Sequence, residues 1–260
     1  MVELKEVSLS YSHKRKAEVA ALRQVNVRFE AGSFSAIIGP SGCGKTSLIK
    51  IIAALITPSE GSVFVGGSPL NEIRRQTAVI FQDFCLLPWK TVMANAELPL
   101  RIHGGVSRND RQKVMSLLAE FGLAAFAKHY PHQLSGGMKQ RLAIVRALVA
   151  EPEILLMDEP FSSLDALTRE DAQDFLLSVQ KERRLTIIMI THSIEEAVYL
   201  ADSVHVMTGV NPGLITEHLE ISRDKNLSHA SFRGEARFHE YCGILRQALL
   251  KSPRHSGEAA

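Results

Sequence analysis

The sequence has few cysteines and aromatic residues, and almost no excess of charge of either sign. Its 260 residues include three cysteines and one tryptophan, and 30 basic against 28 acidic side chains leave a net charge of +2. An odd number of cysteines without a CxxC spacing argues against a disulfide framework and a cysteine-ligated metal, and fits a reducing compartment. The balance of charge lacks the strongly basic footprint of nucleic-acid-binding proteins.

Long apolar runs are absent as well. No stretch approaches the roughly 18 uninterrupted apolar residues of a membrane-spanning helix. The first residues alternate as a strand does and lack the charged start and apolar block of an export signal. We therefore expect a cytosolic chain whose contact with a membrane goes through a partner. Because 45% of the residues are hydrophobic, the chain can still bury a substantial core.

Apolar patterns predict the fold class. Alternation within the first thirty residues predicts two half-buried strands. Short apolar runs at 36–38, 154–157 and 186–190 are typical of strands buried on both faces, and the last two are separated by the helical pattern of 166–184. From about 83 to 150 the apolar residues recur at helical intervals. We predict an α/β fold with a mostly parallel sheet, an N-terminal antiparallel β region and a helical subdomain at 83–150.

The domain boundaries follow from the same patterns. Residues 1–215 are predicted to form a single domain, and 216–260 a short C-terminal helical extension. We expect the helix of this extension to pack on its own chain, and a regulatory contact is the alternative. Its apolar stripe consists of Phe238, Tyr241, Cys242, Leu245 and Leu249.

The stretch "GPSGCGKTS" combines glycines, a lysine and hydroxyl side chains, and it lies between a predicted strand and a predicted helix. It matches G-x-x-x-x-G-K-[ST], in which residues without a Cβ let the backbone N–H groups turn inward around phosphates. The helix start adds partial positive charge. We call this stretch the phosphate loop; its predicted nucleotide contacts are Gly39, Pro40, Ser41, Gly42, Cys43, Gly44, Lys45, Thr46 and Ser47.

We predict a separate role for each of three residues in the phosphate loop. Lys45 would bridge the β- and γ-phosphates as a point charge, and the Thr46 hydroxyl would ligate Mg²⁺. Cys43 is interpreted as a small filler residue. The alternative for Cys43 is a thiol whose pKa is lowered by the helix start, which would make it open to alkylation.

Two acids and a histidine follow buried apolar runs. Asp158 ends "ILLMD" and would reach Mg²⁺, whereas the extended chain would aim the next carboxylate, that of Glu159, elsewhere. Glu159 is therefore the predicted base that orients the attacking water and takes its proton. His192 closes "TIIMITH" at the same edge of the sheet, where open α/β sheets bind ligands, and is predicted to contact the γ-phosphate.

A second glycine cluster, "LSGGMKQR" at 134–141, is the most specific string in the chain. Ser135 is a predicted N-cap, and the helix that follows would aim free amides at an anion. Together with "ILLMDEP", "SSLD" and the histidine after the next strand, this string resembles the ATPase subunit of ATP-binding cassette (ABC) transporters. The resemblance covers about residues 1–215.

This resemblance implies a head-to-tail dimer of two copies with ATP and Mg²⁺ between them. In such a dimer the amides of one chain cover the γ-phosphate that is held by the phosphate loop of the other. Ser135, Gly136 and Gly137 are the implied covering residues.

The resemblance also implies roles for isolated residues. Tyr11 would stack on adenine, with an ordinary core aromatic as the alternative. Gln82 would contact Mg²⁺ and the attacking water and would sense a membrane partner, and Asp165 would lie in the loop that crosses the dimer interface. The string "LLPW" resembles the nitrate, sulfonate and taurine importer branch. Its Trp89, if exposed, would form an apolar groove for a permease helix, and if buried would be core.

The expected function is ATP hydrolysis to ADP and phosphate at the inner face of the cell membrane. The hydrolysis would power a separate permease for the uptake of a small anion, with a solute-binding protein as an indirect partner and no nucleic acid. One alternative is an ABC ATPase of a lipid or division machinery. A less favoured one is a soluble ABC ATPase that acts on DNA or translation, since such relatives carry long insertions, zinc modules or tandem cassettes.

Overall fold

A six-stranded sheet forms the centre of the computed structural model, which describes residues 1–13, 16–102, 104–209, 212–223 and 229–251. The strand order is β10–β9–β3–β8–β7–β6, and all neighbours are parallel except β10, which is antiparallel to β9. The predicted α/β fold with a mostly parallel sheet is thus confirmed. The strands are β3 (Phe34–Ile38), β6 (Thr77–Ile80), β7 (Ile154–Asp158), β8 (Thr186–Ile190), β9 (Ser203–Thr208) and β10 (Leu214–Glu220).

A second, antiparallel sheet has the strand order β2–β1–β4–β5 and confirms the predicted N-terminal β region. The pairing of β1 shifts between Leu4 and Val7, where Glu6 adopts a φ of 50°. Such a bulge adds one residue, so Leu4 and Val7 are both buried although their spacing is odd. The strands are β1 (Val2–His13), β2 (Lys16–Phe29), β4 (Glu60–Val65) and β5 (Ser68–Pro69).

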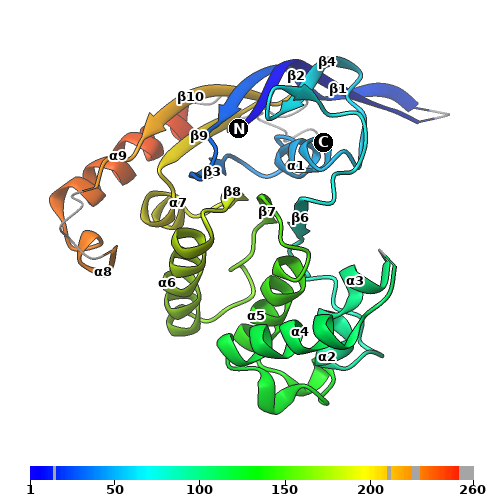
Figure 1. Ribbon diagram of the computed structural model, residues 1–260. Helices are drawn as coiled ribbons and strands as arrows, with labels where there is room; N and C mark the ends of the chain where they lie inside the picture. The colour runs from blue at the N-terminus through cyan, green and yellow to red at the C-terminus, as the bar shows by residue number, and fades with distance from the viewer. Residues whose placement is uncertain (14–15, 103, 210–211, 224–228, 252–260) are drawn as a thin grey trace.

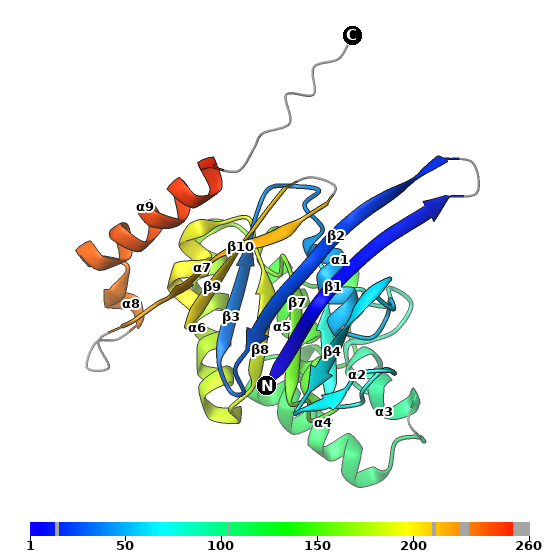
Figure 2. The ribbon, with the colours of Figure 1, turned by 90° about the horizontal axis from the view of Figure 1, so that it is seen from above.

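Helices cover the central sheet on both faces. Figure 1 shows α1 beneath the antiparallel sheet, α2 to α5 gathered at the lower right, and α6 and α7 beside them. Figure 2 shows β1 and β2 crossing over α1. The helices are α1 (Lys45–Ile52), α2 (Val92–Ala96), α3 (Leu98–Ile102), α4 (Arg108–Glu120), η1 (Ala124–Phe126), η2 (Pro131–Gln133), α5 (Gly136–Leu148), α6 (Ala166–Arg183), α7 (Ile194–Leu200), α8 (His229–Phe232) and α9 (Ala236–Lys251).

The central sheet separates two hydrophobic cores. Along β8, Ile188 and Ile190 face a core shared with α1 and the antiparallel sheet. Ile187 and Met189 face the other core, which is formed with the helices. This alternation follows from the period of two in a strand, and it explains why β3, β7 and β8 each contain a continuous apolar run.

The structure sets two boundaries. Helix α1 ends at Ile52, and two residues later Ala54 adopts a left-handed φ of 56°. The predicted domain limit at 215 falls inside β10, which pairs with β9 in the central sheet. The sheet therefore extends beyond that limit.

The C-terminal helix packs on its own chain, as predicted. In α9, Phe238, Cys242 and Leu245 are buried, and they join the core that includes α7. Tyr241 and Leu249 are partly buried at its margin. The predicted extension also includes residues 224–228 and 252–260, which lie outside the described residues.

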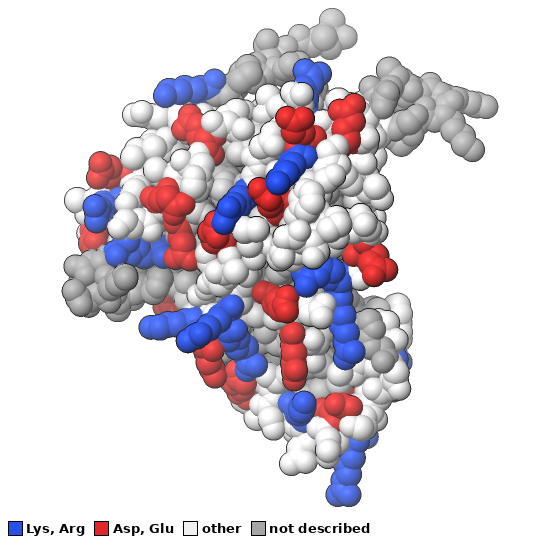
Figure 3. All heavy atoms as spheres, turned by 45° about the horizontal axis from the view of Figure 1, so that its top comes forward, with Lys and Arg blue, Asp and Glu red and all other residues white. Residues whose placement is uncertain are grey.

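The surface carries both signs of charge in close alternation. On the face shown in Figure 3, acidic and basic side chains are interspersed, without an extended field of one sign. Within the described part of the chain, no helix combines the length and the hydrophobicity needed to cross a bilayer.

A buried carboxylate joins three helices on the α2–α5 side. Glu97, which follows α2, is 1% exposed and accepts hydrogen bonds from Arg101 of α3 at 2.5 Å and Arg111 of α4 at 2.9 Å. Burial by itself would raise the pKa of Glu97, but the hydrogen bonds and charges of both arginines outweigh it, so the pKa lies below its usual value.

We predict that Glu97→Gln lowers the free energy of unfolding by about 1–3 kcal/mol at pH 7, since it leaves two guanidinium groups without their carboxylate. A lowered folded-state pKa contributes stability that is present above the unfolded pKa and is lost as pH falls through the folded value. The difference between wild type and variant should therefore shrink below about pH 4.5. Urea denaturation at several pH values measures this difference.

Glu120→Gln is the matched control, because Glu120 is paired with Arg183 and is 39% exposed. A pair that is open to solvent contributes little. Equal losses of stability in the two variants would contradict the role given to Glu97.

Candidate nucleotide-binding site

The phosphate loop connects β3 to α1, as predicted. Gly39 and Gly44 have no room for a side chain: a Cβ on Gly39 would lie 2.3 Å from the carbonyl oxygen of Met207, and one on Gly44 would lie 2.8 Å from that of Ala21. Gly44 is also the N-cap of α1, with a φ of 92° and no side-chain cap. The first amides of α1 are therefore left without a side-chain acceptor, as an anion site requires.

Lys45 lies at the centre of this loop. Its Nζ donates to the carbonyl oxygens of Gly39 and Pro40, both at 2.8 Å, and the residue is 8% exposed. The Lys45 ammonium group is thus held against the backbone of the phosphate loop by two carbonyl oxygens.

Tyr11 and Ser47 form one side of the site. The Tyr11 hydroxyl lies 3.1 Å from the Ser47 Oγ, and Tyr11 is 37% exposed. The alternative that Tyr11 is an ordinary core aromatic is therefore wrong. The hollow at this place measures about 400 Å³ and is lined by Tyr11, Val19, Ala21, Ser41, Gly42, Gly44, Lys45, Thr46, Ser47, Asp158 and Glu159.

Asp158 closes the other side of the hollow from the end of β7. Its Oδ2 accepts a hydrogen bond of 2.8 Å from the Thr46 Oγ1 at the start of α1. Burial raises the pKa of Asp158, and the neighbouring Glu159 carboxylate adds to this effect, while the hydrogen bond from Thr46 opposes it. A cation would favour the charged form here, and a hydroxyl beside a carboxylate is an oxygen set that suits Mg²⁺.

Glu159 departs from the predicted geometry. The prediction relied on an extended chain to turn its carboxylate away from that of Asp158, but β7 ends at Asp158, and Glu159 adopts a left-handed φ of 48°. The Glu159 N–H donates to the carbonyl oxygen of Ile190 at 2.9 Å. A tight turn bonded to β8 therefore sets the direction of this carboxylate. Strained backbone of this kind is concentrated at functional sites.

His192 contacts the predicted base. Its Nδ1 lies 3.2 Å from Glu159 Oε2, although the two residues are 33 positions apart. The parallel register pairs Asp158 with Ile190, so the segments that follow the two strands leave the sheet at the same edge. The structure thus brings the predicted base and the predicted histidine together.

The remaining predicted residues lie outside this hollow. Gln82 is exposed two residues after β6, whose register pairs Ile80 with Met157 and so places Gln82 at the edge where Asp158 ends β7. Trp89 is 70% exposed, which excludes a core role for it.

The second glycine cluster caps α5. The Ser135 Oγ accepts the Met138 N–H at 3.3 Å, which confirms the predicted N-cap. Gly136 and Gly137 face the start of α6: a Cβ on Gly137 would lie 2.6 Å from the Thr168 side chain. These residues do not line the hollow of their own phosphate loop.

Asp165 caps α6 beside that cluster. Its Oδ1 accepts the Thr168 N–H at 3.1 Å, and the hydrogen bonds from Thr168 hold the pKa of Asp165 below its usual value. The cluster at 135–137 and the loop at 162–165 of one chain therefore form a continuous surface.

The sequence did not predict the contacts that hold the residue next to His192, Thr191, in place. The buried Glu196 accepts a hydrogen bond of 2.6 Å from the Thr191 Oγ1, and its Oε1 lies 3.6 Å from the Nε of Arg169. Arg169 in turn donates to the Leu164 carbonyl oxygen at 2.8 Å. Nothing in the string "SIEEA" separates the buried Glu196 from the exposed Glu195, so this link was not predictable.

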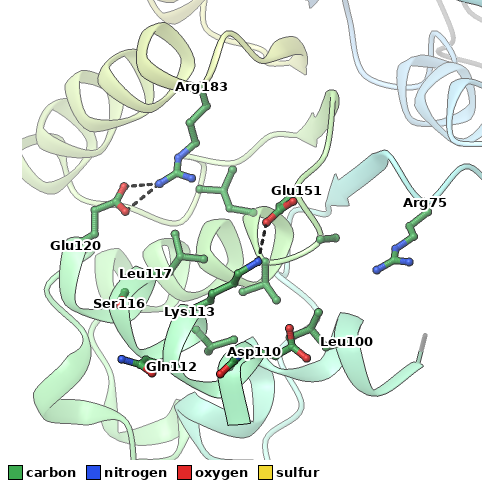
Figure 4. Close-up of a pocket in the computed structure, with 15 residues that line it drawn as sticks. Arg75, Leu100, Asp110, Gln112, Lys113, Ser116, Leu117, Glu120, Glu151 and Arg183 are labelled. Atoms are coloured by element: carbon green, nitrogen blue, oxygen red, sulfur yellow. Dashed lines mark hydrogen bonds and ion pairs between the residues drawn. The ribbon is translucent and has the colours of Figure 1, made fainter. Parts of the chain in front are cut away.

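A second hollow lies on another side of the molecule. It measures about 640 Å³ and lies between α4 and the segments before β7 and β8. Figure 4 shows Lys113 of α4 directed at Glu151, and Arg183 at Glu120. Leu117, Val114, Leu148 and Val149 supply its apolar lining. None of the predicted site residues lines it.

The structure also decides between the two interpretations of Cys43. The thiol is fully buried, and burial raises its pKa although Lys45 opposes the shift. We predict that a thiol reagent modifies the exposed Cys85 in the native protein, and Cys43 and Cys242 only after unfolding, because both are buried. Mass spectrometry of peptides after timed labelling measures the order. Early modification of Cys43 would contradict this interpretation.

Comparison with known proteins agrees with this geometry. The family described as "ABC transporter" matches residues 22–162. The taurine import ATP-binding protein TauB of Yersinia pestis bv. Antiqua is 41% identical over 78% of this chain and 79% of its own. The aliphatic sulfonates import ATP-binding protein SsuB of Bacillus thuringiensis subsp. konkukian is 37% identical over 98% and 97%, respectively.

A solved structure of a similar chain has the same fold. It is described as the dimeric structure of a post-hydrolysis state of the ATP-binding cassette MJ0796 bound to ADP and Pi. It superposes with a TM-score of 0.75 at 33% identity, over 86% of this chain and 100% of that one. With this fold, a matching phosphate loop and relatives that span most of its length, the chain belongs to the ABC transporter family as an ATP-binding cassette.

Proposed function

We propose that this cassette hydrolyses ATP between two head-to-tail copies and thereby drives a separate permease for the uptake of a small anion. The hydrogen bond between Thr46 and Asp158, beside the uncapped start of α1, is the observation that carries the proposal. It brings the phosphate loop and the buried carboxylate of Asp158 to one place. ATP hydrolysis itself is the activity expected of a member of the ABC transporter family.

The nucleotide would occupy the 400 Å³ hollow. Tyr11 would stack on the adenine, and the backbone N–H groups of residues 41–47 would surround the phosphates. Lys45 would exchange its two carbonyl contacts for the β- and γ-phosphate oxygens. Thr46 and Asp158, with Gln82 from the adjacent strand end, would hold Mg²⁺, which neutralises phosphate charge when bound.

Glu159 and His192 would act on the attacking water. Water attacks the γ-phosphorus, the bond from that phosphorus to the β–γ bridging oxygen breaks, and the Glu159 carboxylate takes the proton. The Nδ1 of His192, 3.2 Å from Oε2, orients this carboxylate and keeps the imidazole near the γ-phosphate. The products are ADP and phosphate.

The second copy would complete the site. Ser135, Gly136 and Gly137 do not line the hollow of their own chain, although α5 presents its first amides at that end. Because a helix start binds anions, we propose that they cover the γ-phosphate on the other copy. Asp165, which lies next to them, would lie across the interface.

The partner and the solute are proposed from the relatives. TauB and SsuB are import proteins by name, so we propose a sulfonate or taurine as the solute, with nitrate as a further small anion. The cassette would lie on the cytoplasmic face of the membrane, and a solute-binding protein would deliver the solute. An ABC ATPase of a lipid or division complex is the second candidate, and no observation on this chain favours it.

We predict that Glu159→Gln keeps ATP affinity but lowers turnover by roughly 10²–10⁴-fold, since the water loses its base. The uncleaved nucleotide should then hold two chains together. Sedimentation with Mg-ATP measures the dimer, and a phosphate assay measures the turnover. Turnover at the wild-type rate would show that Glu159 is not the base.

Ser135→Arg in the Glu159→Gln background is the matched control. A bulky cation at the start of α5 leaves the phosphate loop of its own chain intact, so ATP should still bind. It should prevent the two copies from closing on the nucleotide. A dimer that persists in this double variant would contradict the shared site.

The 640 Å³ hollow is the proposed contact for the permease. An occupant would touch α4 on one side and the segments before β7 and β8 on the other, so it would be sensitive to the relative position of helices and sheet. An apolar floor of Leu117 and Val149 between charged side chains of both signs suits a short amphipathic helix. Trp89 is 70% exposed, which is the condition under which the sequence predicts a groove for a permease helix there, and we propose Trp89 as a second contact.

We predict that Gln112→Trp on α4 fills this hollow and abolishes the stimulation of ATP turnover by permease-containing membranes, while turnover without membranes is unchanged. Met115→Trp is the control, because Met115 lies on the same helix, is 40% exposed and does not line the hollow. Stimulation that is equal in the two variants would exclude the hollow as the contact.

A further inference from the structure

The segment after Gln82 contains strained backbone. Phe84 and Cys85 are consecutive and both adopt a left-handed φ, of 59° and 45°. Each such residue costs about 1–2 kcal/mol unless it is glycine. Backbone of this kind persists only where the surroundings impose it, so some contact must hold this segment in place.

One side chain from α5 supplies that contact. The Arg146 Nη2 donates to the carbonyl oxygen of Phe84 at 2.5 Å, and Nη1 donates to that of Cys85 at 2.6 Å. These are charge-assisted bonds from a rigid fork. They hold the two peptide groups in the orientation that the left-handed backbone requires.

The rest of the segment is attached to α2. Asn95, which is fully buried, accepts the Leu87 N–H at 2.8 Å. Its Nδ2 donates to the carbonyl oxygens of Leu87 and Lys90 at 3.1 and 3.0 Å. Residues 84–90 are therefore bound at both ends to helices, although β6 of the central sheet ends only four positions before them, at Ile80. Trp89 lies within this segment and is 70% exposed.

We propose that Arg146 is a positioning residue that makes residues 84–90 move as one body with α5. A displacement of the first residues of α5 is then passed to Trp89. The inference rests on the proposed function, because the nucleotide of the partner copy, acting at Ser135, is what displaces the helix. An α-helix of 13 residues, as α5 is, spans roughly 20 Å and carries such a displacement without bending.

The strain explains why one side chain decides the outcome. Without the guanidinium group, the hydrogen bonds that remain on these two residues are local: the Phe84 N–H donates to the Phe81 carbonyl oxygen at 2.8 Å, and the Cys85 N–H donates to Asp83 Oδ1 at 3.2 Å. The carbonyl groups of Phe84 and Cys85 can then turn to water. The segment then relaxes and no longer follows α5. Arg146 thus selects one of two backbone states, which is the physical basis of a coupling element.

The chain contains its own reporter. Trp89 is the single tryptophan, so tryptophan emission and its quenching by acrylamide report on this segment alone. In Glu159→Gln protein, Mg-ATP should change the quenching of Trp89 as the dimer forms. In the double variant with Arg146→Met, the change should be lost, while ATP affinity and the sedimenting dimer are retained.

Arg141→Met is the matched control. Arg141 also lies on α5, and its replacement by Met removes the same charge. Its guanidinium group lies over the Phe175 ring and is not among the contacts that hold residues 84–90. This variant should keep the full response. Cys85→Gly added to Arg146→Met should restore part of the response, because glycine adopts a positive φ without strain. A role of Arg146 in folding alone predicts that the response follows the thermal stability of the variants, whereas the coupling role predicts its loss in an Arg146→Met protein that is folded and dimeric.

Each result decides between the possibilities. A Trp89 response that survives Arg146→Met, or a dimer that forms in the Glu159→Gln protein without any response, overturns the inference. Absence of the dimer in the Glu159→Gln protein instead contradicts the proposed function, and it removes the driving force of the inference as well. If thermal unfolding shows that Arg146→Met does not fold, Arg146→Lys, which keeps the charge but not the fork, should give a reduced response; a full one refutes the proposal.

Discussion

Parallel pairing of β7, β8 and β3 is the constraint on which the site depends. The register that places Asp158 beside Ile190 makes segments far apart in the sequence leave the sheet at one edge. The hydrogen bond from Thr46 to Asp158 then connects the start of α1 to the end of β7. A shift of one residue in this pairing would turn Asp158 into the core and separate Glu159 from His192.

Two of the places with left-handed backbone are places to which we assign a role in catalysis or coupling. Glu159 owes the direction of its carboxylate to a left-handed turn that is bonded to β8. At Phe84 and Cys85, hydrogen bonds from Arg146 to the two carbonyl groups hold the left-handed backbone. In both cases a contact from a distant segment maintains a conformation that the local sequence does not favour. These two sites are therefore sensitive to movement elsewhere, which suits a protein that couples hydrolysis to a partner.

Much of the fold was predictable because it follows from local periodicity. Each apolar run of β3, β7 and β8 is contained in a few consecutive residues. The strand, glycine loop and helix of the phosphate loop also follow one another directly in the sequence. Tertiary contacts escaped prediction: the turn at Glu159, the burial of Glu196 beside the exposed Glu195, and the bonds from Arg146 to a segment 61 and 62 positions away. The sequence predicted a permease groove at Trp89 if that residue is exposed, and Trp89 is 70% exposed; the hollow beside α4 was not predicted.

The account depends on a nucleotide that is held by two chains at once, and complementation tests this most directly. Chains with Lys45→Ala lack a working phosphate loop, and chains with Ser135→Arg lack a working cover, so each alone should be inactive. A mixture should regain ATP turnover, because a mixed dimer contains one site with an intact loop and an intact cover. A mixture as inactive as its components, although mixed dimers form, would contradict the account.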